Sequence, residues 1–203
     1  MKKVAIIIVT FLALFFGYRY FFSTWEIRNS QPSGENIISF GDSLTYGTGA
    51  NEGMDYPSQL SSMIGKLIIN VGKPGDTTET ALDRLDEDVL SQSPRIVLIT
   101  LGGNDLKNGV SKEVAFRNLR KIVEAIQAEG ALVVIGGVDF PLRSRGFGAA
   151  YEALARDTGC LLVPNVLKGL LGKSELMSDP IHPNGKGYAI MAKKFYGVIK
   201  PYL

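Results

Sequence analysis

Residues 96–105 read IVLITLGGND, an almost wholly apolar run that ends in two glycines, an asparagine and an aspartate. A run this apolar is typical of a strand in the middle of a parallel sheet, where helices cover both faces. Glycine after such a strand permits the tight turn into the next element. The stretch therefore predicts a buried strand over 96–101 whose carboxyl end carries a polar loop.

Working outward from it, short apolar runs alternate with segments of helical periodicity. Strands separated by single helices pair in parallel through right-handed crossovers. The sequence therefore predicts an α/β fold, a three-layer α/β/α sandwich. The other strands are expected over 37–40, 67–71, 131–135 and 161–163, and helices beginning at Pro57 and at Asp76, between Ser111 and Gly130, over 149–158 and over 187–199.

A polar, glycine-containing segment follows each of the first three predicted strands. These segments are Gly41–Ser43, Gly72–Gly75 and Gly102–Asp105. In parallel sheets, ligands bind beyond the carboxyl ends of the strands. All three segments are therefore expected at one edge of the sheet.

Ser43 and His182 are the residues most suited to chemistry at that edge. A serine hydroxyl needs a base to become a nucleophile, and imidazole is the base best matched to neutral pH. The chain contains a single histidine, so His182 is the one candidate for that base. Asp179, three residues earlier, is placed to orient the ring. Donors for a developing oxyanion are expected from the backbone N–H groups of Ser43 and Gly75 and from the side-chain amide of Asn104.

Four motifs in this order resemble the GDSL, or SGNH, hydrolases, over about residues 37–202. The motifs are Gly41–Leu44, Gly75–Thr77, Gly102–Asp105 and Asp179–Pro183. The subgroup that the chain resembles most is the bacterial arylesterase, thioesterase I and lysophospholipase L1 type.

The resemblance implies a flavodoxin-like sheet of five parallel strands and no metal or organic cofactor. It implies that Ser43 is the nucleophile, His182 the base and Asp179 its partner, with Gly75 and Asn104 completing the oxyanion hole. One departure from the subgroup lies in the second motif, where Lys73 and Pro74 precede the glycine.

An acyl-binding surface is expected from the loops after the third and fourth strands. Its candidate residues are Leu106, Phe140, Leu142 and Phe147. The expected substrate is a small-molecule ester or thioester, lipid esters included. The alternatives are a carbohydrate O-acetyl esterase and a membrane-tethered binding module without catalysis. A nucleotide-binding module lacks support, because no glycine-rich phosphate-binding motif is present.

The composition of the chain argues against two classes of ligand, nucleic acids and structural zinc. The net charge is +2 and no long basic run occurs, so nucleic-acid binding is not indicated. One cysteine, Cys160, and one histidine cannot build a structural zinc site. The sequence leaves the oligomeric state open.

The N-terminus differs from the rest of the chain. Lys2 and Lys3 precede an apolar stretch over 4–18, and aromatic residues continue it to Phe22 across Arg19. Residues 4–22 would span roughly 28 Å as a helix, close to the roughly 30 Å core of a bilayer. Residues 1–25 are therefore expected to be a membrane anchor, with a cleaved signal segment as the alternative. A linker over 26–35 and a catalytic domain over 36–203 follow. The positive flank predicts an inner-membrane anchor with the domain in the periplasm or outside the cell, or a secreted or periplasmic domain after cleavage.

Overall fold

The computed structural model describes residues 25–140 and 146–203. Its centre is a five-stranded sheet in the order β2-β1-β3-β4-β5, in which every neighbouring pair is parallel. This confirms the predicted α/β fold. The strands are β1 (Asn36–Gly41), β2 (Ile68–Gly72), β3 (Pro94–Thr100), β4 (Leu132–Gly136) and β5 (Leu161–Val163).

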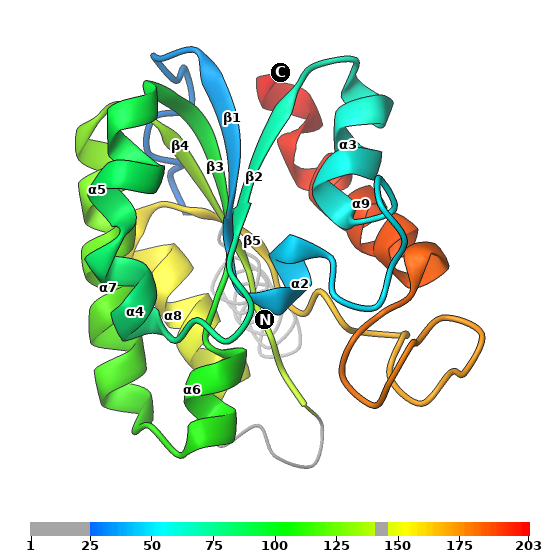
Figure 1. Ribbon diagram of the computed structural model, residues 1–203. Helices are drawn as coiled ribbons and strands as arrows, with labels where there is room; N and C mark the ends of the chain where they lie inside the picture. Colours follow the sequence, from blue (N-terminus) through cyan, green and yellow to red (C-terminus); the bar gives the residue numbers. More distant parts are fainter. Residues whose placement is uncertain (1–24, 141–145) are drawn as a thin grey trace, which may run out of the picture.

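Helices cover both faces of the sheet, so the molecule has three layers (Figure 1). On one side lie α3 and α9, and on the other lie α4, α5, α7 and α8. Short helices α2 and α6 follow β1 and β3. The helices are α2 (Ser43–Tyr46), α3 (Tyr56–Ile64), α4 (Thr78–Asp83), α5 (Leu85–Asp88), α6 (Gly103–Asn108), α7 (Lys112–Ala128), α8 (Phe147–Thr158) and α9 (Gly185–Ile199), with 3-10 turns η1 (Leu90–Gln92) and η2 (Lys200–Tyr202).

The alternation of side chains along the strands divides the core into two clusters. In β1, Ile38 and Phe40 belong to the cluster under α7 and α8, whereas Ile37 belongs to the cluster under α3 and α9. In β3, Val97 and Leu98 divide in the same way, and both are fully buried. Burial on both faces is why most residues of these strands, such as 96–99 in β3, are apolar.

The helix expected from Asp76 onward differs from the prediction. Thr77 caps it through a reciprocal capping box with Thr80, one residue after the start that the sequence pattern predicts at Asp76. The apolar spacing through Leu85 and Val89 predicts one continuous helix. The structure instead has α4, α5 and η1, with a break at Arg84 (φ −106°, ψ 6°). The side chain at this break is bound to groups on β1 and β2, as described below.

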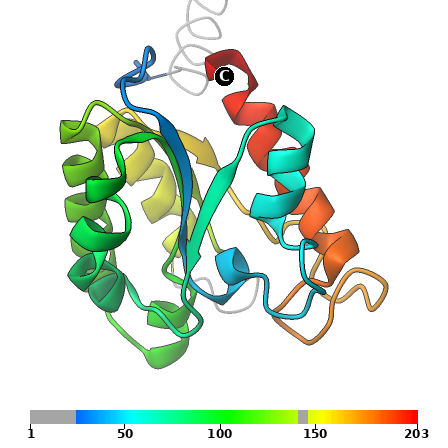
Figure 2. The same ribbon diagram turned by 45° about the horizontal axis from the view of Figure 1, so that its top comes forward.

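The segment before β1, expected to be a linker, lies against the domain. The indole Nε1 of Trp25 donates to the carbonyl of Cys160 at 2.7 Å, and the amide of Asn29 donates to the carbonyls of Gln127 and Ala131, each at 2.9 Å. These acceptors lie around the amino ends of β4 and β5. The segment is therefore docked at the end of the sheet where the strands begin. Helix α2 lies at the opposite end, where the strands finish (Figure 2).

Within the two described ranges, none of the helices combines the length and the apolar character that a bilayer-spanning helix needs. The N-terminal segment predicted to be an anchor or signal lies outside these ranges, as does Leu142.

Candidate active site

The site is built at the edge of the sheet where the strands end. Ser43 is the first residue of α2, directly after β1 and Asp42. Asn104 lies in the first turn of α6, after β3. The loop between β5 and α9 carries His182 and reaches back to the same end of the molecule (Figure 1). The topology therefore brings together segments that are far apart in the sequence.

Ser43, His182 and Asp179 form a hydrogen-bonded chain. The Oγ of Ser43 lies 2.9 Å from Nε2 of His182, and Nδ1 of His182 lies 2.7 Å from Oδ2 of Asp179. An ionised carboxylate only accepts hydrogen bonds, so the Nδ1 position carries the proton and donates it. In the neutral ring, Nε2 is then free to accept the proton of the serine hydroxyl.

The second oxygen of Asp179 holds the loop that carries the histidine. Its Oδ1 accepts from the backbone N–H groups of Ile181 and His182, both at 2.8 Å. Partial burial opposes ionisation of Asp179. The hydrogen bonds from the His182 ring and from these two backbone groups outweigh it, so the pKa of the carboxyl lies below its usual value. Asp179 therefore stays ionised at neutral pH and keeps the ring in the useful tautomer.

Close packing places the serine turn. A Cβ added at Gly41 would collide with the side chain of Thr45 and the carbonyl of Thr100, and one at Gly72 would collide with the backbone of Tyr46. Helix α2 therefore sits directly on the ends of β1 and of its neighbour β2, which requires glycine at both positions. The N–H of Ser43, at the start of α2, points out of the helix without an intrahelical acceptor.

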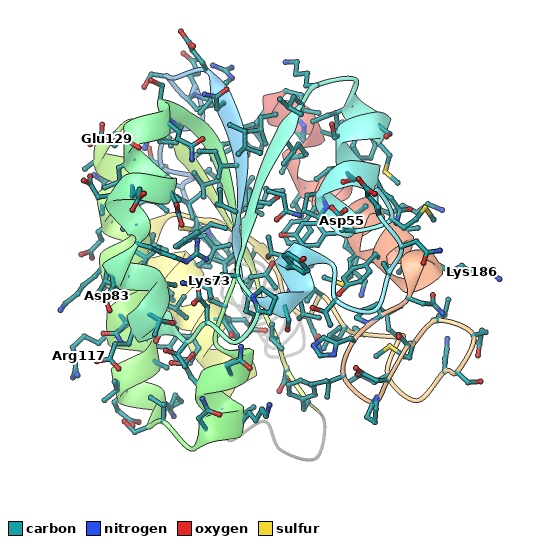
Figure 3. The ribbon with its side chains drawn as sticks, viewed as in Figure 1. Asp55, Lys73, Asp83, Arg117, Glu129 and Lys186 are labelled. Atoms are coloured by element: carbon teal, nitrogen blue, oxygen red, sulfur yellow. The ribbon has the colours of Figure 1, made fainter. Side chains whose placement is uncertain are left out.

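Asn104 is linked to the loop of Gly75 by a hydrogen bond. Gly75 has φ +91°, and a Cβ there would meet no atom within 4 Å, so the glycine is required by the backbone and borders open space. The next residue, Asp76, accepts a hydrogen bond at its carbonyl from Nδ2 of Asn104 at 2.8 Å. One of the two Asn104 amide protons is used in this way, which leaves the other for a ligand. Lys73 and Pro74 are exposed in the same loop (Lys73 is labelled in Figure 3).

Three carboxylates that sequence reasoning did not single out lie buried beneath the site. They are Asp42, Asp76 and Asp105. Burial raises the pKa of Asp42 to about 7, and the charges of Asp76 and Asp105 add to this rise while the N–H of Leu44 opposes it. Asp105 is satisfied by the N–H and hydroxyl of one threonine on α4. Asp42 stands beside the nucleophile in the first motif, which was the signal available in the sequence.

The expected acyl-binding residues are less exposed than the sequence suggested. Leu106 is 8% exposed and Phe147 only 1% exposed, and both belong to the core under α7 and α8. The ring of Phe147 packs edge-on against Phe116, with centroids 5.3 Å apart. Phe140 is partly buried between the two core clusters. Helix α8 begins at Phe147, where a loop was expected, and its packing turns this side chain inward.

Other apolar side chains near the site are exposed. Tyr46, one turn after Ser43 on α2, is 59% exposed, and Ile181, next to His182, is 37% exposed. Met54, which precedes α3, is 42% exposed and lines a hollow of about 380 Å³. Sequence reasoning missed these residues, although Tyr46 and Ile181 lie close to Ser43 and His182 in the chain.

Among the described residues, no cluster of histidine, cysteine and acidic side chains is arranged to hold a metal ion. Cys160 is buried, and burial raises the pKa of its thiol to about 12.

A profile of the GDSL-like lipase/acylhydrolase family matches residues 39–190, which include every motif described above. The chain belongs to this family. It is therefore a hydrolase that acts on ester bonds.

Curated relatives carry matching names. The esterase TesA of Pseudomonas aeruginosa is 27% identical over 87% of this chain and 94% of its own. The arylesterase of Vibrio mimicus is 33% identical over 76% of this chain and 82% of its own. The thioesterase 1/protease 1/lysophospholipase L1 of Escherichia coli is 28% identical over 74% and 76%.

Solved structures agree with the fold. The crystal structure of TesA superposes with a TM-score of 0.79 at 27% identity, over 83% of this chain and all of that one. AlinE4, an SGNH-hydrolase family esterase, superposes with a TM-score of 0.67 at 31% identity, over 82% and 94%. This hydrolase thus shares its sheet and helical layers with esterases of the same family.

Proposed function

We propose that this hydrolase cleaves carboxylic esters and thioesters through an acyl-enzyme formed on Ser43. The observation that carries the proposal is the chain of hydrogen bonds from Ser43 Oγ to His182 Nε2 at 2.9 Å and from His182 Nδ1 to Asp179 Oδ2 at 2.7 Å. The order of the three groups matches a nucleophile, a base and a group that orients the base.

In the first step, Ser43 Oγ attacks the acyl carbon while His182 Nε2 takes the hydroxyl proton. The negative oxygen of the tetrahedral intermediate accepts hydrogen bonds from the N–H groups of Ser43 and Gly75 and from the amide of Asn104. Collapse of the intermediate breaks the bond to the alcohol or thiol, which leaves with the proton from His182. In the second step, water attacks the acyl-enzyme, again with His182 as base, and releases the acid and the free serine.

Exposed apolar side chains support an apolar portion in the substrate. Tyr46 and Ile181 flank Ser43 and His182 in the chain and expose much of their surface. The curated relatives named esterase, arylesterase and lysophospholipase favour acyl esters of this kind for the present chain.

A second candidate is removal of acetyl groups from carbohydrate. It is favoured by the hollow of about 380 Å³ beside the histidine loop, whose lining includes the polar side chains of Asn51, Glu175, Asn184 and Lys186. The two candidate functions are distinguished by the rates of hydrolysis of nitrophenyl esters of graded acyl length and of acetylated sugars, measured at the same enzyme concentration. A rate that rises with acyl length supports the first function, and a preference for acetylated sugars supports the second.

Replacement of Ser43 by alanine tests the mechanism. Ser43→Ala and His182→Ala are each expected to lower kcat for nitrophenyl butyrate by about 10³-fold or more, because removal of the nucleophile or of its base blocks acyl-enzyme formation. A fluorophosphonate probe is expected to label the unmodified chain at Ser43. Circular dichroism checks folding, and wild-type rates in the folded variants would overturn the proposal.

Residues 4–22 are proposed to anchor the chain in the inner membrane, with the domain in the periplasm or outside the cell. The lysines at positions 2 and 3 ahead of an apolar run support this topology. Flotation of the expressed chain with membranes, together with its N-terminal sequence, tests it. A soluble chain that begins after residue 22 would show cleavage instead.

A further inference from the structure

Arg84 lies at the break between α4 and α5 and points into the protein. Its side chain is 12% exposed. Nε donates to Oδ2 of Asp76 at 2.6 Å, Nη1 donates to the carbonyl of Val71 at 2.8 Å, and Nη2 donates to the carbonyl of Gly41 at 3.0 Å. The guanidinium also lies over the ring of Phe40, 4.5 Å from its centroid. One side chain therefore joins β1, β2 and the loop after β2.

These contacts reach the groups that are proposed to bind the oxyanion. Asp76 follows Gly75 in the chain, and its carbonyl holds the amide of Asn104 at 2.8 Å. The other carboxylate oxygen of Asp76 accepts from the hydroxyl of Thr80 at 3.0 Å. When Arg84 fixes Asp76, it therefore restricts both Gly75, through the chain, and Asn104, through the hydrogen bond.

The third proposed oxyanion donor, the N–H of Ser43, lies on the β1 side of the site. Ser43 lies two residues after Gly41, whose carbonyl is bound by the same guanidinium. The guanidinium thus joins the serine turn to the Gly75 loop, and the backbone N–H of Lys73 in that loop donates to the same Gly41 carbonyl at 2.9 Å. A lysine carries its three N–H donors on one nitrogen, so it cannot reproduce the planar fork that reaches these acceptors from Nε, Nη1 and Nη2.

Burial distinguishes this arrangement from a surface ion pair. Asp76 is 5% exposed, whereas the surface pair of Arg120 and Asp157 is 40% and 49% exposed. Asp42 and Asp105 are buried in the same region, and the charge of Asp76 contributes to the raised pKa of Asp42. A cation at Arg84 offsets part of this negative charge next to the place where an oxyanion forms.

We propose that Arg84 is a positioning residue, which holds the Gly75–Asn104 side of the oxyanion hole at a set distance from the N–H of Ser43. The inference rests on the roles proposed above for Ser43, Gly75 and Asn104. It adds a residue that does not touch the substrate and acts through Asp76.

The test compares Arg84→Lys and Arg84→Met with the unmodified full chain, with kcat expressed per active site titrated by a fluorophosphonate. We expect kcat to fall about 10- to 100-fold with KM within threefold, because a shift of about 1 Å in the donors weakens binding of the transition state but not of the ester. A trifluoromethyl ketone that forms a tetrahedral adduct with serine is expected to bind more weakly by the same factor.

Arg120→Met is the matched control. Arg120 lies on the exposed face of α7, in ion pairs with Glu124 and Asp157, and its loss is expected to leave kcat per site unchanged. Asp88→Asn removes the remaining ion pair of Arg84, at 2.6 Å, which lies on the more exposed side of the guanidinium. Its effect on kcat is expected to stay within threefold.

Asp76→Asn provides a second route if the Arg84 variants fold poorly. It keeps the carbonyl that holds Asn104 and removes the charge that Arg84 binds. We expect a loss of kcat similar to that of Arg84→Met, and a double variant no worse than about the larger single loss, because both act through one contact.

A merely structural role would lower the titrated fraction of active sites and leave kcat per site and ketone affinity unchanged, and that result would overturn the inference. The same holds if Arg84→Lys and Asp76→Asn both retain kcat within threefold. Failure of the proposed function is distinguishable from failure of this inference, because it would appear as activity retained by Ser43→Ala.

Discussion

At the scale of single residues, the site contains two aspartates whose pKa values are shifted in opposite directions. Asp179 is ionised and partly exposed, with hydrogen bonds that lower its pKa. Asp42, one residue before the nucleophile, is 2% exposed and has a pKa raised to about 7 by burial. Asp179 is therefore negatively charged at neutral pH, whereas Asp42 stays protonated at acidic pH.

The raised pKa of Asp42 predicts a specific dependence of stability on pH. Between about pH 4 and 7 the native state keeps a proton that the unfolded chain releases, so the free energy of unfolding falls as pH rises through this window. Asp42→Asn lacks this titration and keeps an oxygen for the N–H of Leu44. Relative to the unmodified chain, the variant is expected to gain stability from pH 4 to pH 8 by a few kcal/mol, at about 1.4 kcal/mol per unit of pKa.

Urea unfolding at pH 4, 6 and 8 measures this difference. Asp83→Asn, at an exposed position on α4, serves as the control and should show no such trend. A difference for Asp42→Asn that stays the same at all three values would contradict the buried, protonated acid.

At the scale of elements, α8 supports the turn from β3 into α6, the helix that carries Asn104. The hydroxyl of Tyr151 on α8 donates to the carbonyl of Leu101 at 2.6 Å, and both residues are fully buried. A Cβ on Gly102 would collide with this hydroxyl. The turn from β3 into α6 is thus packed against a side chain from a helix that begins more than forty residues later.

Tyr151→Phe is expected to lower the free energy of unfolding by about 1–3 kcal/mol, because the buried carbonyl of Leu101 loses its donor while the ring contacts remain. Those contacts include Phe116, with centroids 4.8 Å apart. Thermal or urea unfolding measures the change. Tyr196→Phe, which removes a hydroxyl from a partly exposed position on α9, is the control, and equal losses in the two variants would count against this role.

At the scale of the whole molecule, the docked N-terminal segment and the catalytic residues lie at opposite edges of the sheet. Trp25 is held at Cys160, just before β5, whereas Ser43 follows β1. The strands separate the two edges by about 20 Å for a strand such as β3, at about 3.3 Å per residue. With residues 4–22 in a membrane, as proposed, this geometry turns the active site away from that membrane.

The expected consequence is a preference for esters that arrive from the aqueous side. In proteoliposomes, the full chain should hydrolyse a lysophospholipid of its own bilayer about tenfold more slowly than a variant with a 20-residue Gly/Ser insert before Trp25. Such an insert reaches about 25 Å and frees the domain to turn.

A water-soluble nitrophenyl ester, hydrolysed equally by both forms, is the control for folding, and flotation verifies that both are anchored. Equal rates on the bilayer lipid would contradict the orientation, and a chain that fails to float would contradict the anchor.

The fold followed from local patterns. Apolar runs such as 96–101 and helical spacing such as that between Ser111 and Gly130 report burial along one segment, and the structure reproduces these elements within one or two residues at most ends. The helix start predicted at Asp76 likewise lies within two residues of α4, which begins at Thr78. The continuous helix through Val89 was wrong, because the binding of Arg84 to strand carbonyls overrides the local periodicity.

The sequence by itself determined the layers, the parallel sheet and the residue types for ester hydrolysis, because hydrophobic periodicity and the order of motifs can be recognised along the chain without the fold. Only the tertiary structure decided that Ser43 and His182, 139 positions apart, meet at 2.9 Å, and that Phe147 turns into the core. It also decided that Arg84 joins two strands to the Gly75 loop and that Trp25 docks at the far edge. These contacts depend on how distant segments pack, which no single segment encodes.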